Sequence, residues 1–153
     1  MTSISLEFKQ ELHQFCLAHA KEKINRIEKL LQSNFNDLST ASKSSAGDKH
    51  ETSRAMLHLE QENYSKQLMQ AQSNLKILAQ IKCNPQDVIG SGALIQTNQG
   101  IFYMSVGIGE LLFKETHVYL ISPGSPLGQQ MIGKSSTFQF RFNETEYYIE
   151  GVI

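Results

Sequence analysis

The stretch SSAGDKHET, residues 44–52, separates two long segments of helical pattern and so decides how the first half of the chain folds. It carries two carboxylates, Asp48 and Glu51, three residues apart. At the start of a helix, that spacing places both acids on one side. An acid followed three residues later by Glu is also the pattern of a capping box. Local sequence therefore leaves two interpretations, a helix cap or a pair of oxygen ligands for Mg²⁺.

The segments on either side have the heptad spacing of an antiparallel helical hairpin. Residues 4–34 place apolar side chains at intervals of three and four, and residues 49–82 repeat this pattern. The small, polar side chains of residues 35–47 predict the connection between the helices, and the ends of this stretch can continue the helices in a frayed form. Antiparallel pairing is centred near Ser44. The predicted partners are Leu31 with Leu57, Ile24 with Tyr64, Ala20 with Leu68, and Leu17 with Ala71.

Asn84-Pro85 ends the helical pattern, because proline lacks a backbone donor and disfavours helix in the residue before it. We therefore predict two domains, residues 1–84 and residues 85–153. The fold class is α+β: a coiled-coil hairpin followed by a small, mostly antiparallel β-sheet domain with one short helix. The predicted strands are 93–97, 101–106, 117–122, 137–143 and 146–152, and the predicted helix lies within 125–134.

Composition indicates an ordered protein, since 40% of the 153 residues are hydrophobic and 19% are charged. No apolar run approaches the roughly 18 residues of a membrane span. The charged residues Glu7 and Lys9 stand where a signal peptide needs an unbroken apolar stretch. We therefore expect a cytoplasmic protein with no membrane contact. Cys16 and Cys83 are too few for a disulfide framework, and we expect them to be thiols.

Charge is divided unevenly along the chain. Residues 1–86 hold 11 Lys and Arg against 9 Asp and Glu, whereas residues 87–153 hold 3 against 6. Neither part has the strongly basic character of an autonomous nucleic-acid binder. No Ser-His-Asp or Cys-His arrangement stands out either, so a self-contained hydrolase is poorly supported.

Residues 121–134, ISPGSPLGQQMIGK, resemble the C-terminal domain of bacterial Gre transcript-cleavage factors. Members of that family carry a similar Ser-Pro-Leu/Ile, a small residue and then Leu/Ile-Gly-Lys between strands of an FKBP-like module. Residues 47–51, GDKHE, resemble the acidic tip of the antiparallel coiled coil in the same family. The resemblance covers nearly the whole chain and is most specific at these two stretches.

This resemblance implies a Gre-like transcription elongation factor that inserts its coiled-coil tip into the secondary channel of RNA polymerase. Asp48 and Glu51 would be catalytic in the sense of helping to hold a second Mg²⁺, shared with the polymerase. That ion would activate water for cleavage of a backtracked RNA, so the nascent 3′ end is met indirectly. The resemblance further implies a monomer without a stand-alone active site or a tightly bound cofactor. The implied polymerase-docking residues are Ser122, Pro123, Ser125, Pro126 and Leu127.

The chain departs from the family directly after the acids. Gre factors usually continue with Asn-Ala-Glu and an aromatic residue, whereas this chain has Thr52-Ser53-Arg54-Ala55. The aromatic residue is lost and an acid is replaced by Arg54, so an alternative is a regulator or inhibitor that occupies the channel without stimulating cleavage. A third hypothesis, a prolyl isomerase, requires an aromatic-lined pocket that the sequence does not specify.

Overall fold

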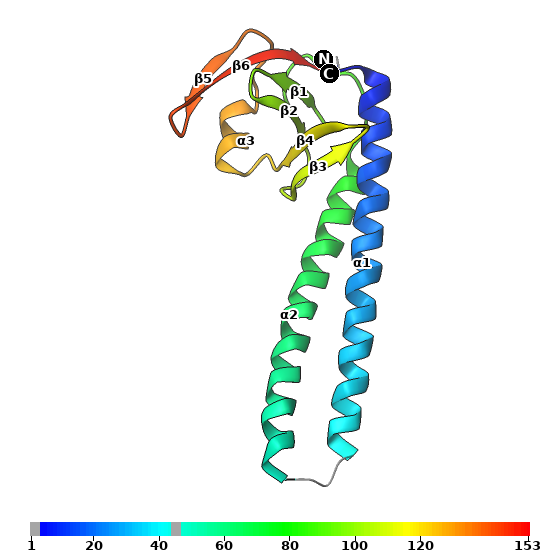
Figure 1. Cartoon of the computed structure of the whole chain (residues 1–153). Helices are drawn as coiled ribbons and strands as arrows, with labels where there is room; N and C mark the ends of the chain where they lie inside the picture. The colour runs from blue at the N-terminus through cyan, green and yellow to red at the C-terminus, as the bar shows by residue number, and fades with distance from the viewer. Residues whose placement is uncertain (1–3, 44–46) are drawn as a thin grey trace. The chain divides into compact units, whose positions relative to one another are not determined.

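The computed structural model describes the backbone of residues 4–43 and 47–153; the side chains of residues 42, 43 and 47–50 lie outside the description. Within these ranges, none of the helices combines the length and apolar character needed to cross a membrane. The predicted α+β class is confirmed: a long helical hairpin precedes a six-stranded sheet and a short helix (Figure 1).

Contacts divide the chain into two compact units. The sheet unit comprises Met1–Leu17 and Ile77–Ile153, and the hairpin unit comprises Ala18–Lys76. Each of the two long helices therefore contributes residues to both units. This division by contact differs from the predicted boundary after residue 84, which stays a prediction about domains.

The two long helices are α1, Leu6–Lys43, and α2, Gly47–Gln80 (Figure 1). Ser5 caps the start of α1, where its Oγ accepts a hydrogen bond from the backbone N–H of Phe8 at 3.1 Å. The end of α2 precedes Asn84-Pro85 by a few residues, as the proline predicts.

The expected connection over residues 35–47 is too long, because α1 continues as far as Lys43. Ser, Thr and Asn each cost under about 1 kcal/mol in a helix interior, and an already nucleated helix propagates through them. Leu38 is buried within this polar segment and supplies a packing contact. Thr40 Oγ1 donates to the Asn36 carbonyl at 3.0 Å, a bond that a helix tolerates.

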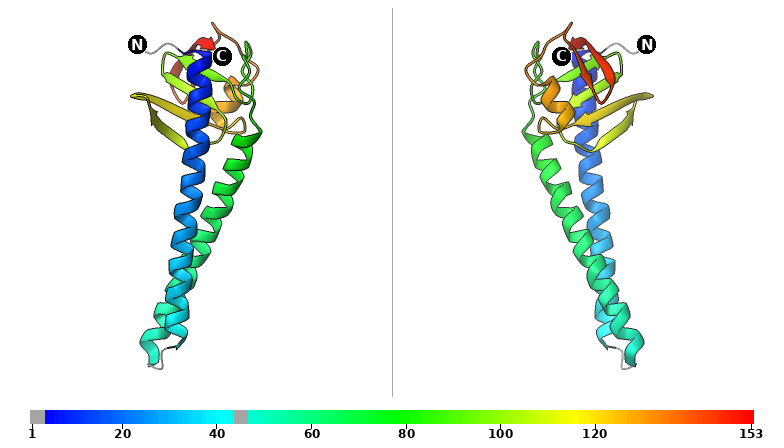
Figure 2. Two further views of the ribbon diagram at one scale, coloured as in Figure 1. Left: turned by 90° about the vertical axis from the view of Figure 1, so that its right-hand side faces the viewer. Right: turned by 90° about the vertical axis from the view of Figure 1, so that its left-hand side faces the viewer.

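The seam of the hairpin unit follows the heptad spacing. In this unit α1 and α2 run alongside each other in Figure 1 and overlap in both views of Figure 2. Asn34 Nδ2 donates to the Leu57 carbonyl at 2.9 Å, about one helical turn beyond the predicted partner Leu31. The pairing is shifted because α1 is longer than predicted. Its last residue, Lys43, and the first residue of α2, Gly47, are centred on residue 45 rather than on Ser44. The packed seam consists of Ile24, Ile27, Leu31, Tyr64, Leu68, Ala71 and Leu75.

The sheet has the strand order β3-β4-β2-β1-β6-β5. Neighbouring strands are antiparallel except for β2 and β4, which are parallel. The predicted hairpin turns at 98–100 and 143–145 are confirmed. The strands are β1 Leu94–Thr97, β2 Gly100–Met104, β3 Gly109–Phe113, β4 Thr116–Ile121, β5 Gln139–Phe142 and β6 Thr145–Val152, and the short helix is α3 Pro126–Met131.

Strand β3 was not predicted from the sequence. It lies at one edge of the sheet and most of its side chains are exposed, so it lacks a clear apolar alternation. The tight turn into β4 uses Lys114 and Glu115 at φ 48° and 61°. Such turns are normally signalled by Gly or Asn, and neither stands here.

Helices cover both faces of the sheet within the sheet unit. Phe102 and Tyr103 are neighbours on β2 and therefore point to opposite faces. Phe102 belongs to the core cluster that includes Met131 of α3. Tyr103 contacts His13 of α1, and the ring of Phe113 on the same face lies against Phe8 and Phe15 of α1. The sheet core is consequently closed by α3 on one side and by the first turns of α1 on the other.

Candidate interaction sites

The acidic pair lies at the start of α2. This helix begins at Gly47, which places Asp48 in its first turn, and the residue before it lies outside the described residues, so the capping box stays a prediction. The side chain of Asp48 lies outside the described residues, and Glu51 is exposed one turn further on. Helical backbone through both positions agrees with the predicted spacing on one side of a helix.

The donor set at this helix start fits a shared magnesium ion better than a closed site. Two carboxylates supply too few ligands for the six positions around Mg²⁺, so water and a partner must complete the shell. The positive end of the α2 dipole also opposes a cation there unless both acids are ionised. No group of three or more His, Cys, Asp or Glu side chains suited to a metal occurs among the described residues. The metal role of Asp48 and Glu51 stays a prediction.

The predicted docking stretch forms the loop before α3 and the first residues of that helix, and the side chain of Ser125 has a clear local role. Ser125 is the N-cap of α3: its Oγ accepts from the Gly128 N–H at 3.0 Å and donates to the Ser122 carbonyl at 2.8 Å. Pro126 opens the helix, where its missing N–H costs nothing. These residue types are thus explained by the turn into α3.

Packing explains two residues of α3 that follow this loop. A Cβ added to Gly128 would lie 2.1 Å from the Ser122 carbonyl oxygen, so only glycine fits. Leu127 is half-buried and packs against the sheet core. Among the predicted docking residues Pro126 is exposed, whereas Ser122, Pro123, Ser125 and Leu127 are half-buried. The role of this stretch in docking on a polymerase stays a prediction.

The structure also reveals a buried polar cluster that was not predicted as a unit: Lys9, His13, Cys16, Cys83 and Tyr103. Lys9 Nζ donates to the carbonyls of Asn84 and Ile153, both at 2.8 Å. His13 Nδ1 and the Tyr103 hydroxyl oxygen are hydrogen-bonded at 2.8 Å. The spacing of residues 9, 13 and 16 continues the hairpin seam toward the N-terminus, which is the signal that could have located them.

Burial shifts the titration of this cluster. Desolvation lowers the pKa of Lys9. The pKa of His13 is lowered by burial first and by the charge of nearby Lys9 second. Burial raises the pKa of Tyr103 above its ordinary range and that of Cys16 to about 12. His13 is therefore neutral at pH 7 and Cys16 is a thiol.

The expectation of free thiols is confirmed, as Cys16 is buried, Cys83 is half-buried and neither forms a disulfide. Cys83 Sγ lies 4.0 Å from the Tyr103 hydroxyl. The high pKa of Cys16 makes it a poor nucleophile, because the thiolate is the reactive form. We assign this cluster to the packing of α1 against the sheet.

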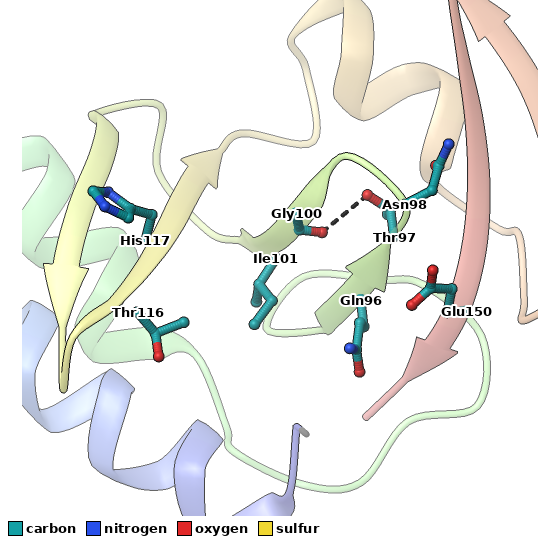
Figure 3. Close-up of a pocket in the computed structure, with 8 residues that line it drawn as sticks. All are labelled: Gln96, Thr97, Asn98, Gly100, Ile101, Thr116, His117 and Glu150. Carbon is teal, nitrogen blue, oxygen red and sulfur yellow. Dashed lines mark hydrogen bonds between the residues drawn. The ribbon is translucent and has the colours of Figure 1, made fainter. Parts of the chain in front are cut away.

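A polar hollow of about 320 Å³ lies beside β1 and β4 in the sheet unit (Figure 3). Its most polar residues already have partners in the fold. Thr97 Oγ1 donates to the Gly100 carbonyl at 2.9 Å, and Asn98 bonds the backbone of β6 through both ends of its amide. His117 pairs with Glu110 of β3. These contacts fix turns and strand edges. Among the polar residues that line the hollow, Gln96 and Glu150 have the fewest side-chain contacts described.

Together, the architecture is that of a helical hairpin with acids at the start of its second helix, attached to a small α+β sheet module. No family model matches the chain, and no curated protein matches it. One similar solved structure is described as the transcription factor Gfh1, at 14% identity and a TM-score of 0.37. The likeness covers 90% of this chain and 92% of that chain. At this score and identity, it assigns no family.

Proposed function

We propose that this protein is a Gre-like transcription elongation factor that binds RNA polymerase and inserts its hairpin end into the secondary channel. The observation that carries the proposal is the continuity of the hairpin: α1 ends at Lys43 and α2 begins at Gly47, next to the acids. Within the hairpin unit, α2 runs from Gly47 to Lys76, about 45 Å at the helical rise. A narrow support of that length suits entry into a channel.

Asp48 and Glu51 would act at the polymerase active centre as two of the ligands of a shared Mg²⁺. The ion, when bound, would lower the pKa of a water that attacks the backtracked RNA. The chain itself would supply negative charge at the start of a helix, and the polymerase would supply the remaining ligands and the RNA. In this proposal the chain works as a monomer in the bacterial cytoplasm and has no active site of its own.

The second candidate is a regulator that occupies the channel without stimulating cleavage. The observation that favours it is Arg54, which is exposed three residues after Glu51 on the same helix. Side chains at this spacing are neighbours, and a positive charge there opposes the binding of a cation by the acids. The residues that replace the family's Asn-Ala-Glu-aromatic sequence thus weaken the metal role and leave channel binding intact.

Transcript cleavage in stalled elongation complexes tests the two candidates together. The elongation factor should accelerate shortening of the RNA 3′ end, and the Asp48→Asn, Glu51→Gln double variant should bind polymerase but lose the acceleration. A Glu60→Gln, Glu62→Gln variant of the same helix is the control for charge. Full acceleration of cleavage by the double variant would rule out the metal role of Asp48 and Glu51. If the wild-type chain binds polymerase but does not accelerate cleavage, the second candidate is selected.

A further inference from the structure

The hairpin unit presents one large aromatic side chain between two hollows. Phe35 of α1 is 61% exposed. One hollow is lined by Leu31 of α1 and Gln61 of α2, and the other by Arg54 and His58 of α2. Phe35 and Gln61 border both hollows, so the ring forms a ridge between them. A ridge with a hollow on each side gives a partner a surface of complementary shape to pack against, which a flat helix surface does not.

Exposed apolar side chains are frequent in this part of the hairpin unit. A scattered exposed Leu or Met is ordinary on a protein surface. A Phe beside an Arg is different, since aromatic residues and Arg are enriched at protein–protein contacts. The large apolar residues concerned are Leu30 at 45%, Phe35 at 61%, Met56 at 66% and Leu59 at 61% exposed.

The charges around the ridge indicate which kind of partner fits. No ion pair joins Arg54 to a side chain that the structure describes. Glu28 lines the hollow on the other side of Phe35, so the surface pairs one cation with one anion. Nucleic-acid surfaces need several phosphate-neutralising cations, and this surface does not supply them. An apolar protein segment with a carboxylate matches both the ring and a guanidinium that forms no ion pair with a described side chain.

We propose that Phe35 and Arg54 form a docking patch for a protein segment that carries an apolar side chain next to a carboxylate. The inference rests on the proposed function, with RNA polymerase as the source of the segment. The apolar side chain enters the hollow between Phe35 and Leu38, and the carboxylate accepts two hydrogen bonds from Arg54. The patch lies on the flank of the hairpin and fixes the rotation of the hairpin about its long axis.

Binding of the full chain to core RNA polymerase tests the patch with matched variants. Phe35→Ala is compared with Met69→Ala, an exposed apolar residue elsewhere in the hairpin unit, and Arg54→Glu with Arg26→Glu. Each patch variant should raise Kd at least about tenfold, as expected for contact hot spots, and each control by less than about twofold. All four residues are exposed, so thermal denaturation should show four folded variants.

Four outcomes would overturn the inference. Wild-type binding by both patch variants removes the patch and leaves the proposed function standing. Absence of polymerase binding by the wild-type chain removes the proposed function and the patch with it. If the patch variants bind polymerase normally but lose affinity for a single-stranded RNA oligonucleotide, the surface is assigned to nucleic-acid binding. If the patch variants bind polymerase normally but, without polymerase, sediment with a lower mass than the wild-type chain, the surface is assigned to contact between copies of this chain.

Discussion

The hairpin unit and the sheet unit bury their side chains in different ways. In the hairpin unit, one seam between two helices supplies the packed cluster around Ile24, Ile27 and Ala71, and most other side chains face solvent. In the sheet unit, both faces of the sheet are covered, and Leu94, Tyr103 and Ile149 are fully buried. A single seam gives each side chain fewer neighbours, so the hairpin unit should tolerate changes that the sheet unit cannot.

Truncation of a core leucine should show the largest difference between the units. Leu120→Ala in β4 removes a side chain that is 1% exposed and should cost about 2 to 5 kcal/mol of unfolding free energy. Leu31→Ala in the hairpin seam removes a half-buried side chain and should cost clearly less, because water can reach the vacated space. Urea denaturation followed by circular dichroism measures both, and equal losses would contradict the comparison.

The same contrast explains how much of the fold was predictable. Heptad spacing alone located the hairpin and its seam residues, because a two-helix seam repeats one local pattern. The extension of α1 through Asn36 and Thr40 was missed, since helix continuity there depends on packing at Leu38. β3 was missed because an exposed edge strand after an atypical turn carries little local signal.

The candidate sites were predictable to different degrees. The acids lie at a helix start as expected. Ser125 caps α3, a local role that the sequence alone did not reveal, and docking through this stretch stays a prediction. The Lys9, His13 and Tyr103 contacts join residues that are far apart in sequence, so spacing along one helix could not reveal them. Long-range pairing of this kind is visible only once the sheet is assembled.

A smaller expected effect concerns the α3 loop of the sheet unit. Gly128→Ala places a methyl group against the Ser122 carbonyl and should cost about 1 to 3 kcal/mol as the loop shifts. Gly124→Ala is the matched control, since a Cβ there meets no atom within 4 Å. Thermal denaturation separates the two variants. A Gly128→Ala protein as stable as the control would show that the loop has no fixed close contact.

The pH dependence of the sheet unit should report on His13. Its pKa in the folded chain is lowered by burial and by Lys9, so the unfolded chain binds the proton more readily. Stability is therefore complete above the ordinary histidine pKa of about 6.5 and falls as pH drops below it. The urea midpoint should decrease between about pH 7.5 and pH 5, less steeply in His13→Gln than in the exposed control His58→Gln. Equal slopes would contradict the shift.

The smallest expected effect lies in the hairpin seam. Asn34 is 1% exposed, and its Oδ1 is buried without a hydrogen-bond partner among the described residues. Asn34→Leu should stabilise the chain by about 0.5 to 1 kcal/mol, because an unsatisfied buried oxygen is removed. Asn36→Leu changes an exposed position and serves as the control. Loss of stability in Asn34→Leu would instead give the Asn34 to Leu57 bond a role in holding the helices in register.

The proposed function requires that the hairpin end, and not the sheet unit, reaches the active centre of RNA polymerase. The most direct measurement places a photo-crosslinking side chain at position 51 and, in a second protein, at position 144 in the β5–β6 turn. Position 51 should crosslink to polymerase residues beside the catalytic metal and to the RNA 3′ end, and position 144 should not. Crosslinks at the active centre from position 144, or none from position 51 in a bound complex, would contradict the account.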